Sequence, residues 1–128
     1  MKRRRLFFVP ALLFLPGSLL FVAVAPPHTL LSTLVVGCLF VAGCGFAVAG
    51  LVPSVSVGGR EVPWYAFAGV ADVALGVSML LNAVQMAAGG SGEDLFLAVA
   101  TGLAGLPLLF IGADYLRGGK YLDVSVFE

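Results

Sequence analysis

Charged residues are scarce in this sequence. Lys, Arg, Asp and Glu make up 11% of its 128 residues, whereas a soluble domain carries about 25%. Seven basic residues balance seven acidic residues, so charge indicates neither a nucleic-acid surface nor an acidic partner. The composition therefore argues against a nucleic-acid-binding protein and against a protein whose main solvent is water.

Metal-binding and catalytic residue types are equally sparse. The two cysteines, Cys38 and Cys44, lie six residues apart, too far around a helix to share a face, and the single histidine, His28, has no neighbouring ligand. The sequence contains no nucleophile with a base, no phosphate-binding glycine loop and no nucleotide motif. We therefore expect no catalytic residue, no metal site and no cofactor, and we interpret the cysteines as packing residues.

Hydrophobic residues, in contrast, make up 60% of the chain and form four long blocks. Each block is close to the roughly 20 residues that a helix needs to cross a bilayer. The blocks cover about residues 6–25, 29–52, 62–88 and 95–116. Short, turn-forming separators predict that consecutive helices are antiparallel. The predicted fold is an all-α integral membrane protein, one domain over residues 1–128, with four transmembrane helices in an antiparallel bundle.

Basic residues predict the orientation of these spans, because Lys and Arg near membrane ends are retained in the cytoplasm. Lys2 to Arg5 precede the first block, Arg60 lies between the second and third, and Arg117 and Lys120 follow the fourth. All seven fall on one side of four spans. We therefore expect a multi-pass protein of the cell membrane with both termini cytoplasmic and a cytoplasmic tail at residues 117–128.

The first block has a second interpretation. Lys2 to Arg5, the apolar stretch and Ala23-Val24-Ala25 have the three parts of a secretory signal peptide. The apolar stretch is longer than the roughly 7–15 residues of a signal peptide, and Pro26 would follow the cleavage site. We therefore interpret the block as a span. The abundance of Ala, Val, Gly and Leu is typical of a GC-rich prokaryotic genome.

Small residues predict where the helices pack, because close approach of backbones drives helix association in lipid. Three of the blocks carry stripes of residues spaced by four and three positions. These stripes are Gly43, Ala47 and Gly50; Tyr65, Gly69, Asp72, Gly76, Met79, Ala83 and Met86; and Ala98, Gly102, Gly105, Leu109 and Gly112. We expect the three stripes to face one another.

Asp72 is the acid that lies deepest in a block, about 15 Å along a helix that starts at residue 62. A charge at such a depth costs about 3 kcal/mol or more. Asp72 either pins helices together as a protonated or hydrogen-bonded acid, or binds a proton or cation in a translocation path. Tyr65, Asn82 and Thr101 complete the candidate intramembrane polar site. Few polar residues lie at this depth, which favours the structural role.

Asp114 is interpreted as a boundary residue. It lies near the end of the fourth block and three positions before Arg117. Oppositely charged residues at this spacing share a helix face. We therefore expect Asp114 to form an ion pair with Arg117.

Two segments on the cytoplasmic side alternate as strands do. Ser54–Val57, the turn Gly58-Gly59 and the return through Val62 predict a hairpin over residues 54–62. Residues 120–127 predict a third strand beside it, and the alternative is that both segments are flexible. In the three-stranded cap, Tyr121, Asp123, Ser125 and Phe127 would offer a docking surface to another chain.

Two functions fit these features. The first is a small structural or accessory membrane protein, not an enzyme, which packs in the lipid bilayer against a second copy of itself or another membrane protein. The second is an oligomeric proton- or cation-coupled transporter or channel built around Asp72. The two hypotheses differ in what they require of Asp72, since only the transporter needs it for transport.

Overall fold

The computed structural model describes residues 3–89 and 92–128. Within these residues, most of the chain is helical. The elements, in chain order, are η1 (Arg3–Phe7), α1 (Phe8–Val24), α2 (Leu30–Leu51), β1 (Ser54–Val57), β2 (Arg60–Pro63), α3 (Trp64–Ala88), α4 (Gly92–Leu116) and η2 (Val124–Phe127). Four helices, the first counted together with η1, are long and apolar enough to cross a membrane. The prediction of four long apolar helices is confirmed.

The ends of the helices follow local signals. The Thr29 side chain accepts a hydrogen bond from the backbone N–H of Ser32 at 3.1 Å and so caps the start of α2. Helix α4 begins at Gly92, three residues earlier than the apolar block predicted. Glu93 and Asp94 lie in its first turn, where the positive end of the helix dipole favours acidic residues. The polar separator was therefore partly the start of a helix.

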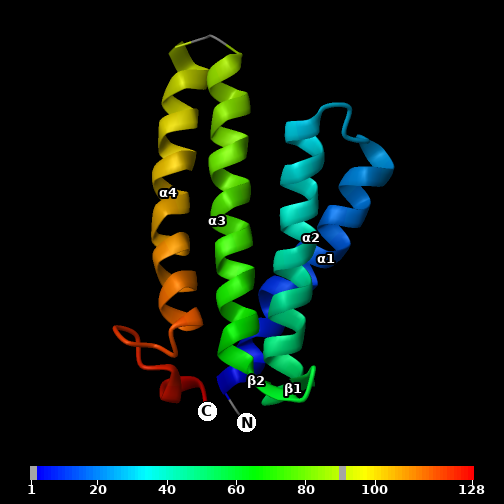
Figure 1. Cartoon of the computed structure of the whole chain (residues 1–128). Coiled ribbons are helices and arrows are strands. Elements are labelled where there is room, and N and C mark those ends of the chain that lie inside the picture. The colour runs from blue at the N-terminus through cyan, green and yellow to red at the C-terminus, as the bar shows by residue number, and fades with distance from the viewer. Residues whose placement is uncertain (1–2, 90–91) are drawn as a thin grey trace.

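The four helices form a row in sequence order. The most extensive contacts join α1 to α2, α2 to α3 and α3 to α4. Figure 1 shows α4 and α3 side by side, with α2 on the other side of α3; the end of α1 lies beyond α2, whereas its start crosses behind α2 toward α3. Consecutive helices are antiparallel, as expected, but α1 and α4 are outer helices with a neighbour mainly on one side.

Glycine lets the backbones of α3 and α4 touch. A Cβ atom added at Gly69 would lie 2.8 Å from the carbonyl oxygen of Gly112, and one at Gly76 would lie 2.9 Å from that of Gly105. Real Cβ atoms do not approach a backbone oxygen this closely. At Gly102 the nearest atom to an added Cβ is 3.6 Å away. The stripes of α3 and α4 therefore face each other, and they are tightest at two glycine pairs.

The expectation that the stripe of α2 also faces α3 is wrong. A Cβ atom at Gly43 or Gly50 would lie 2.8 or 2.9 Å from side chains of α1. The glycine that faces α3 is Gly45, where an added Cβ would lie 2.8 Å from the carbonyl oxygen of Phe67. Helix α2 lies between α1 and α3 and therefore has two contact faces. The predicted stripe of Gly43, Ala47 and Gly50 describes only the face toward α1.

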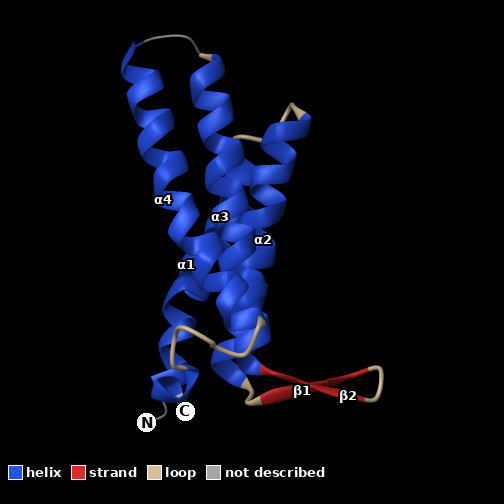
Figure 2. Ribbon diagram, turned by 60° about the vertical axis from the view of Figure 1, so that its left-hand side comes forward, coloured by secondary structure: helices blue, strands red, loops and turns tan. Residues whose placement is uncertain are grey.

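The predicted hairpin is present. Strands β1 and β2 pair antiparallel, with Ser54 opposite Pro63 and Val57 opposite Arg60. Gly58 and Gly59 make the turn with φ values of +57° and +78°, a conformation that residues with a Cβ rarely adopt. Figure 2 shows that the two-stranded ribbon projects sideways from the ends of the helices.

The prediction of a third strand is wrong. In the described part of the chain the sheet has two strands, and residues 124–127 form the short helix η2. Gly118 and Gly119, with φ values of +86° and +75°, turn the chain sharply after α4. The backbone groups that a strand would have offered to the hairpin are used elsewhere, because Asp114 binds the N–H groups of Tyr121 and Leu122.

Most segments meet at one end of the row, which we call the hairpin end. It holds η1, the end of α2, the hairpin, the start of α3, the end of α4 and η2. Its core is a cluster of Ala49, Trp64, Ala68 and Tyr115, with side chains of η1 and η2 packed against it. A second cluster, centred on Phe46, joins α1, α2 and α3 nearer their middle.

Candidate functional site

Asp72 lies on α3, one turn after Ala68 of the hairpin-end core. Its side chain is 7% exposed. Among residues 3–89 and 92–128, no hydrogen bond or ion pair reaches its carboxyl group. The hydroxyl group of Tyr115, on α4, lies within range of electrostatic interaction with the carboxylates of both Asp72 and Asp114. Asp72 is therefore buried beside α4 without a direct partner in the described chain.

The other predicted members of the polar site do not join Asp72. Tyr65 lies at the hairpin end, where its ring is 5.8 Å from that of Trp64 and nearly perpendicular to it. Asn82 lies ten residues beyond Asp72, about 15 Å along α3. The Thr101 hydroxyl donates a long hydrogen bond of 3.7 Å to the sulfur of Met86. The four residues are thus spread along the length of α3 and α4.

The hydroxyl groups of Ser18 and Ser78, which are buried, bond to their own helices. Ser18 donates to the carbonyl oxygen of Leu15 at 3.0 Å, and Ser78 donates to that of Leu75 at 2.7 Å. Hydroxyls that bond back in this way offer little to a neighbouring helix. In the described residues they therefore supply no second polar group around Asp72.

Asp114 anchors the tail. Its side chain is 2% exposed. Its carboxylate accepts hydrogen bonds from the backbone N–H of Tyr121, at 3.0 and 3.2 Å, and from that of Leu122, at 2.8 Å. The expected ion pair with Arg117 is absent from the described residues, because the carboxylate faces the returning chain. An acid followed by Gly118-Gly119 was the sequence signal for such a return.

The tail residues proposed for docking separate into two groups. Tyr121 is 65% exposed, with the Lys120 ammonium 5.6 Å from the centre of its ring. Phe127, in contrast, turns inward, and its ring lies 5.3 Å from that of Phe7 and 6.0 Å from that of Trp64. Three of the four predicted docking residues, Tyr121, Asp123 and Ser125, are therefore exposed. Phe127 belongs to the interior of the hairpin end.

Asp123 begins η2. Its carboxylate accepts hydrogen bonds from the backbone N–H of Ser125, at 2.9 Å, and from the Ser125 hydroxyl. These bonds to Ser125 lower the pKa of Asp123, since they favour its charged form. The interaction gives the exposed tail a defined local conformation.

Comparison with known proteins places the chain in one family. The model of a family of unknown function, DUF7994, matches residues 1–128. The chain belongs to DUF7994. Neither a curated protein nor a solved structure matches this DUF7994 chain. The part of the chain that the structure describes also holds no group of three or more His, Cys, Asp or Glu side chains that could bind a metal ion.

Proposed function

We propose that this DUF7994 protein is a small four-span structural or accessory membrane protein. It acts through helix packing against another membrane protein or a second copy of itself, and through contacts of its hairpin and tail on the cytoplasmic side. The observation that carries this proposal is that the polar groups of the described helices do not gather around Asp72. The hydroxyls of Ser18 and Ser78 bond to their own backbones, and the Gln85 amide donates to the Ser32 hydroxyl far from Asp72.

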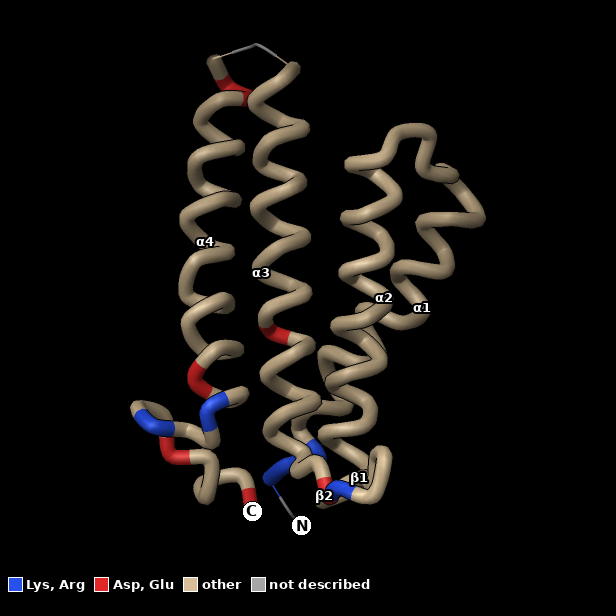
Figure 3. The backbone as a smooth tube through the Cα atoms, in the orientation of Figure 1, with Lys and Arg blue, Asp and Glu red and all other residues tan. Residues whose placement is uncertain are grey.

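The distribution of charge supports the cytoplasmic placement of the hairpin end. Figure 3 shows the Lys and Arg residues of the described chain gathered at this end, whereas Asp and Glu lie at both ends of the helices and within α3. The basic residues concerned are Arg3, Arg4, Arg5, Arg60, Arg117 and Lys120. Because basic residues next to spans are retained in the cytoplasm, this arrangement supports both termini being cytoplasmic.

Photo-crosslinking in native membranes tests the proposal. A photoreactive residue at Phe110, which is exposed on the outer helix α4, or at Tyr121 should give a discrete adduct with another protein or with a second copy. The same group at Ala71, which is fully buried, is the matched control. The proposal is contradicted if the positions on α4 and the tail give only lipid adducts, as a protein without neighbours would.

Lys120 and Tyr121 allow a second, quantitative test. Substituting both by Ala should reduce recovery of the partner cross-linked from the tail, because both residues are exposed and the ring of Tyr121 lies against the exposed ring of Phe110, 5.9 Å away. Glu93→Ala, at the opposite end of the row, is the control. Equal recovery from the double variant and the wild type would show that Lys120 and Tyr121 do not contact the partner.

The alternative function is a proton- or cation-coupled transporter or channel that oligomerises around Asp72. One observation favours it, namely that Asp72 is buried without a partner in the described residues, as a group that exchanges a proton or cation would be. In proteoliposomes with an imposed pH gradient, the wild type should dissipate the gradient and Asp72→Asn should not. Flux that survives the substitution excludes this mechanism.

A further inference from the structure

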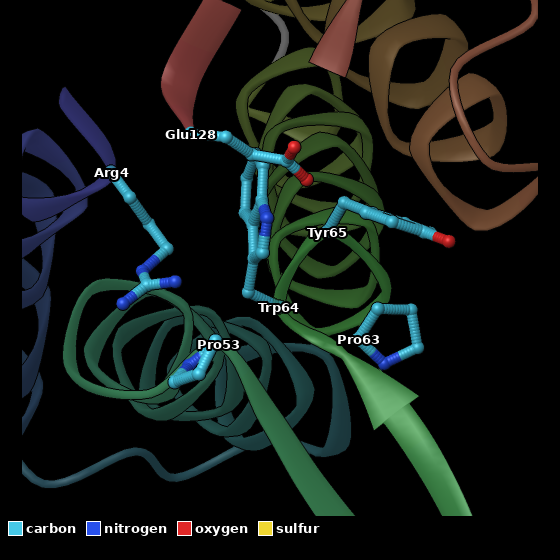
Figure 4. Close-up of a pocket in the computed structure, with 6 residues that line it drawn as sticks. All are labelled: Arg4, Pro53, Pro63, Trp64, Tyr65 and Glu128. Atoms are coloured by element: carbon cyan, nitrogen blue, oxygen red, sulfur yellow. The ribbon is translucent and has the colours of Figure 1, made fainter. Parts of the chain in front are cut away.

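A pocket of about 280 Å³ opens at the hairpin end, apart from Asp72 and from the exposed tail residues. Figure 4 shows the six side chains around it, which come from η1, the two ends of the hairpin, the start of α3 and the residue that follows η2. They are Arg4, Pro53, Pro63, Trp64, Tyr65 and Glu128.

Two hydrogen-bond donors of this pocket are buried without an acceptor. Arg4 is 7% exposed and Trp64 is 2% exposed. The Nε atom of Arg4 and the Nε1 atom of Trp64 have no hydrogen-bond partner in the described chain. An unsatisfied buried donor costs about 1–3 kcal/mol, and more when it is charged. Such groups are normally satisfied, so each donor calls for an acceptor that the described residues do not supply.

Arg4 is placed inward by the turn of η1. Its neighbours Arg3 and Arg5 are exposed, whereas Arg4 is buried. Figure 4 shows its guanidinium group extending from η1 toward the indole of Trp64, on the side of Pro53. Pro53 follows the end of α2, where the helix dipole favours a cation. Within the described chain, however, the Arg4 guanidinium forms no hydrogen bond or ion pair.

We propose that this pocket binds a phosphate group, with the Arg4 guanidinium as the donor that holds it. The guanidinium fork matches the oxygen atoms of a phosphate and can bind two of them at once. The phosphate belongs either to the headgroup of an anionic phospholipid or to a free ion. Basic pockets between the cytoplasmic ends of spans bind headgroups, and Trp and Tyr at such ends lie at headgroup level.

Glu128 opposes the bound anion. Its side chain lines the same pocket but forms no ion pair with Arg4 in the described chain. A carboxylate there repels a phosphate and competes for the guanidinium if it swings inward. Removing its charge should therefore tighten binding, whereas a general loss of structure would weaken it.

The single tryptophan of the chain makes the pocket observable. The full chain in a neutral detergent is titrated with phosphatidylglycerol, phosphatidylcholine or inorganic phosphate, and the fluorescence of Trp64 is recorded. Phosphatidylglycerol should change the emission saturably. Phosphatidylcholine should need about a tenfold higher concentration to produce the same change. A similar response to inorganic phosphate would assign the site to the free ion. No saturable response to either phosphatidylglycerol or inorganic phosphate overturns the proposal.

Neighbouring arginines provide the matched control. Arg4→Gln should weaken phosphatidylglycerol binding about tenfold, which corresponds to about 1.4 kcal/mol. Arg3→Gln and Arg5→Gln remove the same charge from exposed positions and should change binding less than about twofold. Equal losses in all three variants would mean that the lipid is attracted by net charge alone, which contradicts a site at Arg4.

Two further variants keep the test decisive if Arg4→Gln does not fold. Arg4→Lys keeps the charge but removes the guanidinium fork, and should weaken binding about threefold when lipid adducts are counted by native mass spectrometry. Glu128→Gln should strengthen it by a similar factor. If neither variant changes the number of bound phosphatidylglycerol molecules relative to the wild type, the proposed pocket is not the binding site.

Discussion

The end of α4 and the middle of α3 each bury an aspartate, and the two surroundings differ. Asp114 is 2% exposed and accepts backbone hydrogen bonds from Tyr121 and Leu122. Asp72 is 7% exposed and has no hydrogen-bond partner in the described chain. At the end of a helix, the chain that follows still has free N–H groups, whereas in the middle every backbone N–H is bound within its helix. Burial alone therefore does not reveal the role of an acid.

The largest expected effect is at Asp114. Asp114→Ala leaves two backbone N–H groups without their acceptor and frees the tail, so the free energy of unfolding in detergent should fall by about 3 kcal/mol or more. Amide hydrogen exchange of Tyr121 and Leu122 should accelerate at the same time. Unchanged exchange at these two amides would show that the tail is held by other contacts, chiefly those of Phe127.

The second largest effect is expected at the contact between Gly69 of α3 and Gly112 of α4. An added Cβ at Gly112 would lie 2.7 Å from the carbonyl oxygen of Gly69. Gly112→Ala should therefore separate α3 from α4 and destabilise the protein by about 1–3 kcal/mol. Gly37→Ala is the control, because nothing lies within 4 Å of its added Cβ. Equal denaturation midpoints for both variants would contradict the close contact.

Asp72→Asn should have a small effect on stability, less than about 1 kcal/mol, since no hydrogen bond in the described chain is lost and the shape is kept. Asp114→Asn, measured in the same unfolding assay, should lose more because it replaces a charged acceptor. A larger loss at Asp72 than at Asp114 would reverse the comparison and reveal a partner that holds the Asp72 carboxylate.

An exposed acid, Asp123, should show the smallest effect. Hydrogen bonds from Ser125 lower its pKa in the folded protein, so they stabilise the tail above the ordinary pKa of Asp, about 3.9, and this contribution is lost as the pH falls through the lowered value. In Ser125→Ala the pKa of Asp123 should rise toward its ordinary value. A carboxyl NMR titration measures both, and an identical midpoint in the variant would contradict the role of the hydroxyl.

Some residues of the site could be predicted and others could not. The spacing of Gly69 and Gly76 with Gly105 and Gly112 indicated a packing face, because a repeat of four and three is a property of one helix. The roles of Gly45, Arg4 and Phe127 could not be predicted in this way. Each depends on which neighbour the helix or tail meets, and a single helix with two neighbours carries two overlapping patterns.

Four long apolar helices and a tight hairpin turn follow from local features of the sequence. Hydropathy, chain length and the positive φ of Gly58-Gly59 are local properties, so they do not depend on the rest of the molecule. Contacts between distant segments, in contrast, determine which acid is hydrogen-bonded, which path the tail follows and which arginine turns inward. Residues 120–127 alternate as a strand would, yet Asp114 takes their first backbone donors, because a buried carboxylate gains more from them than an exposed hairpin edge does.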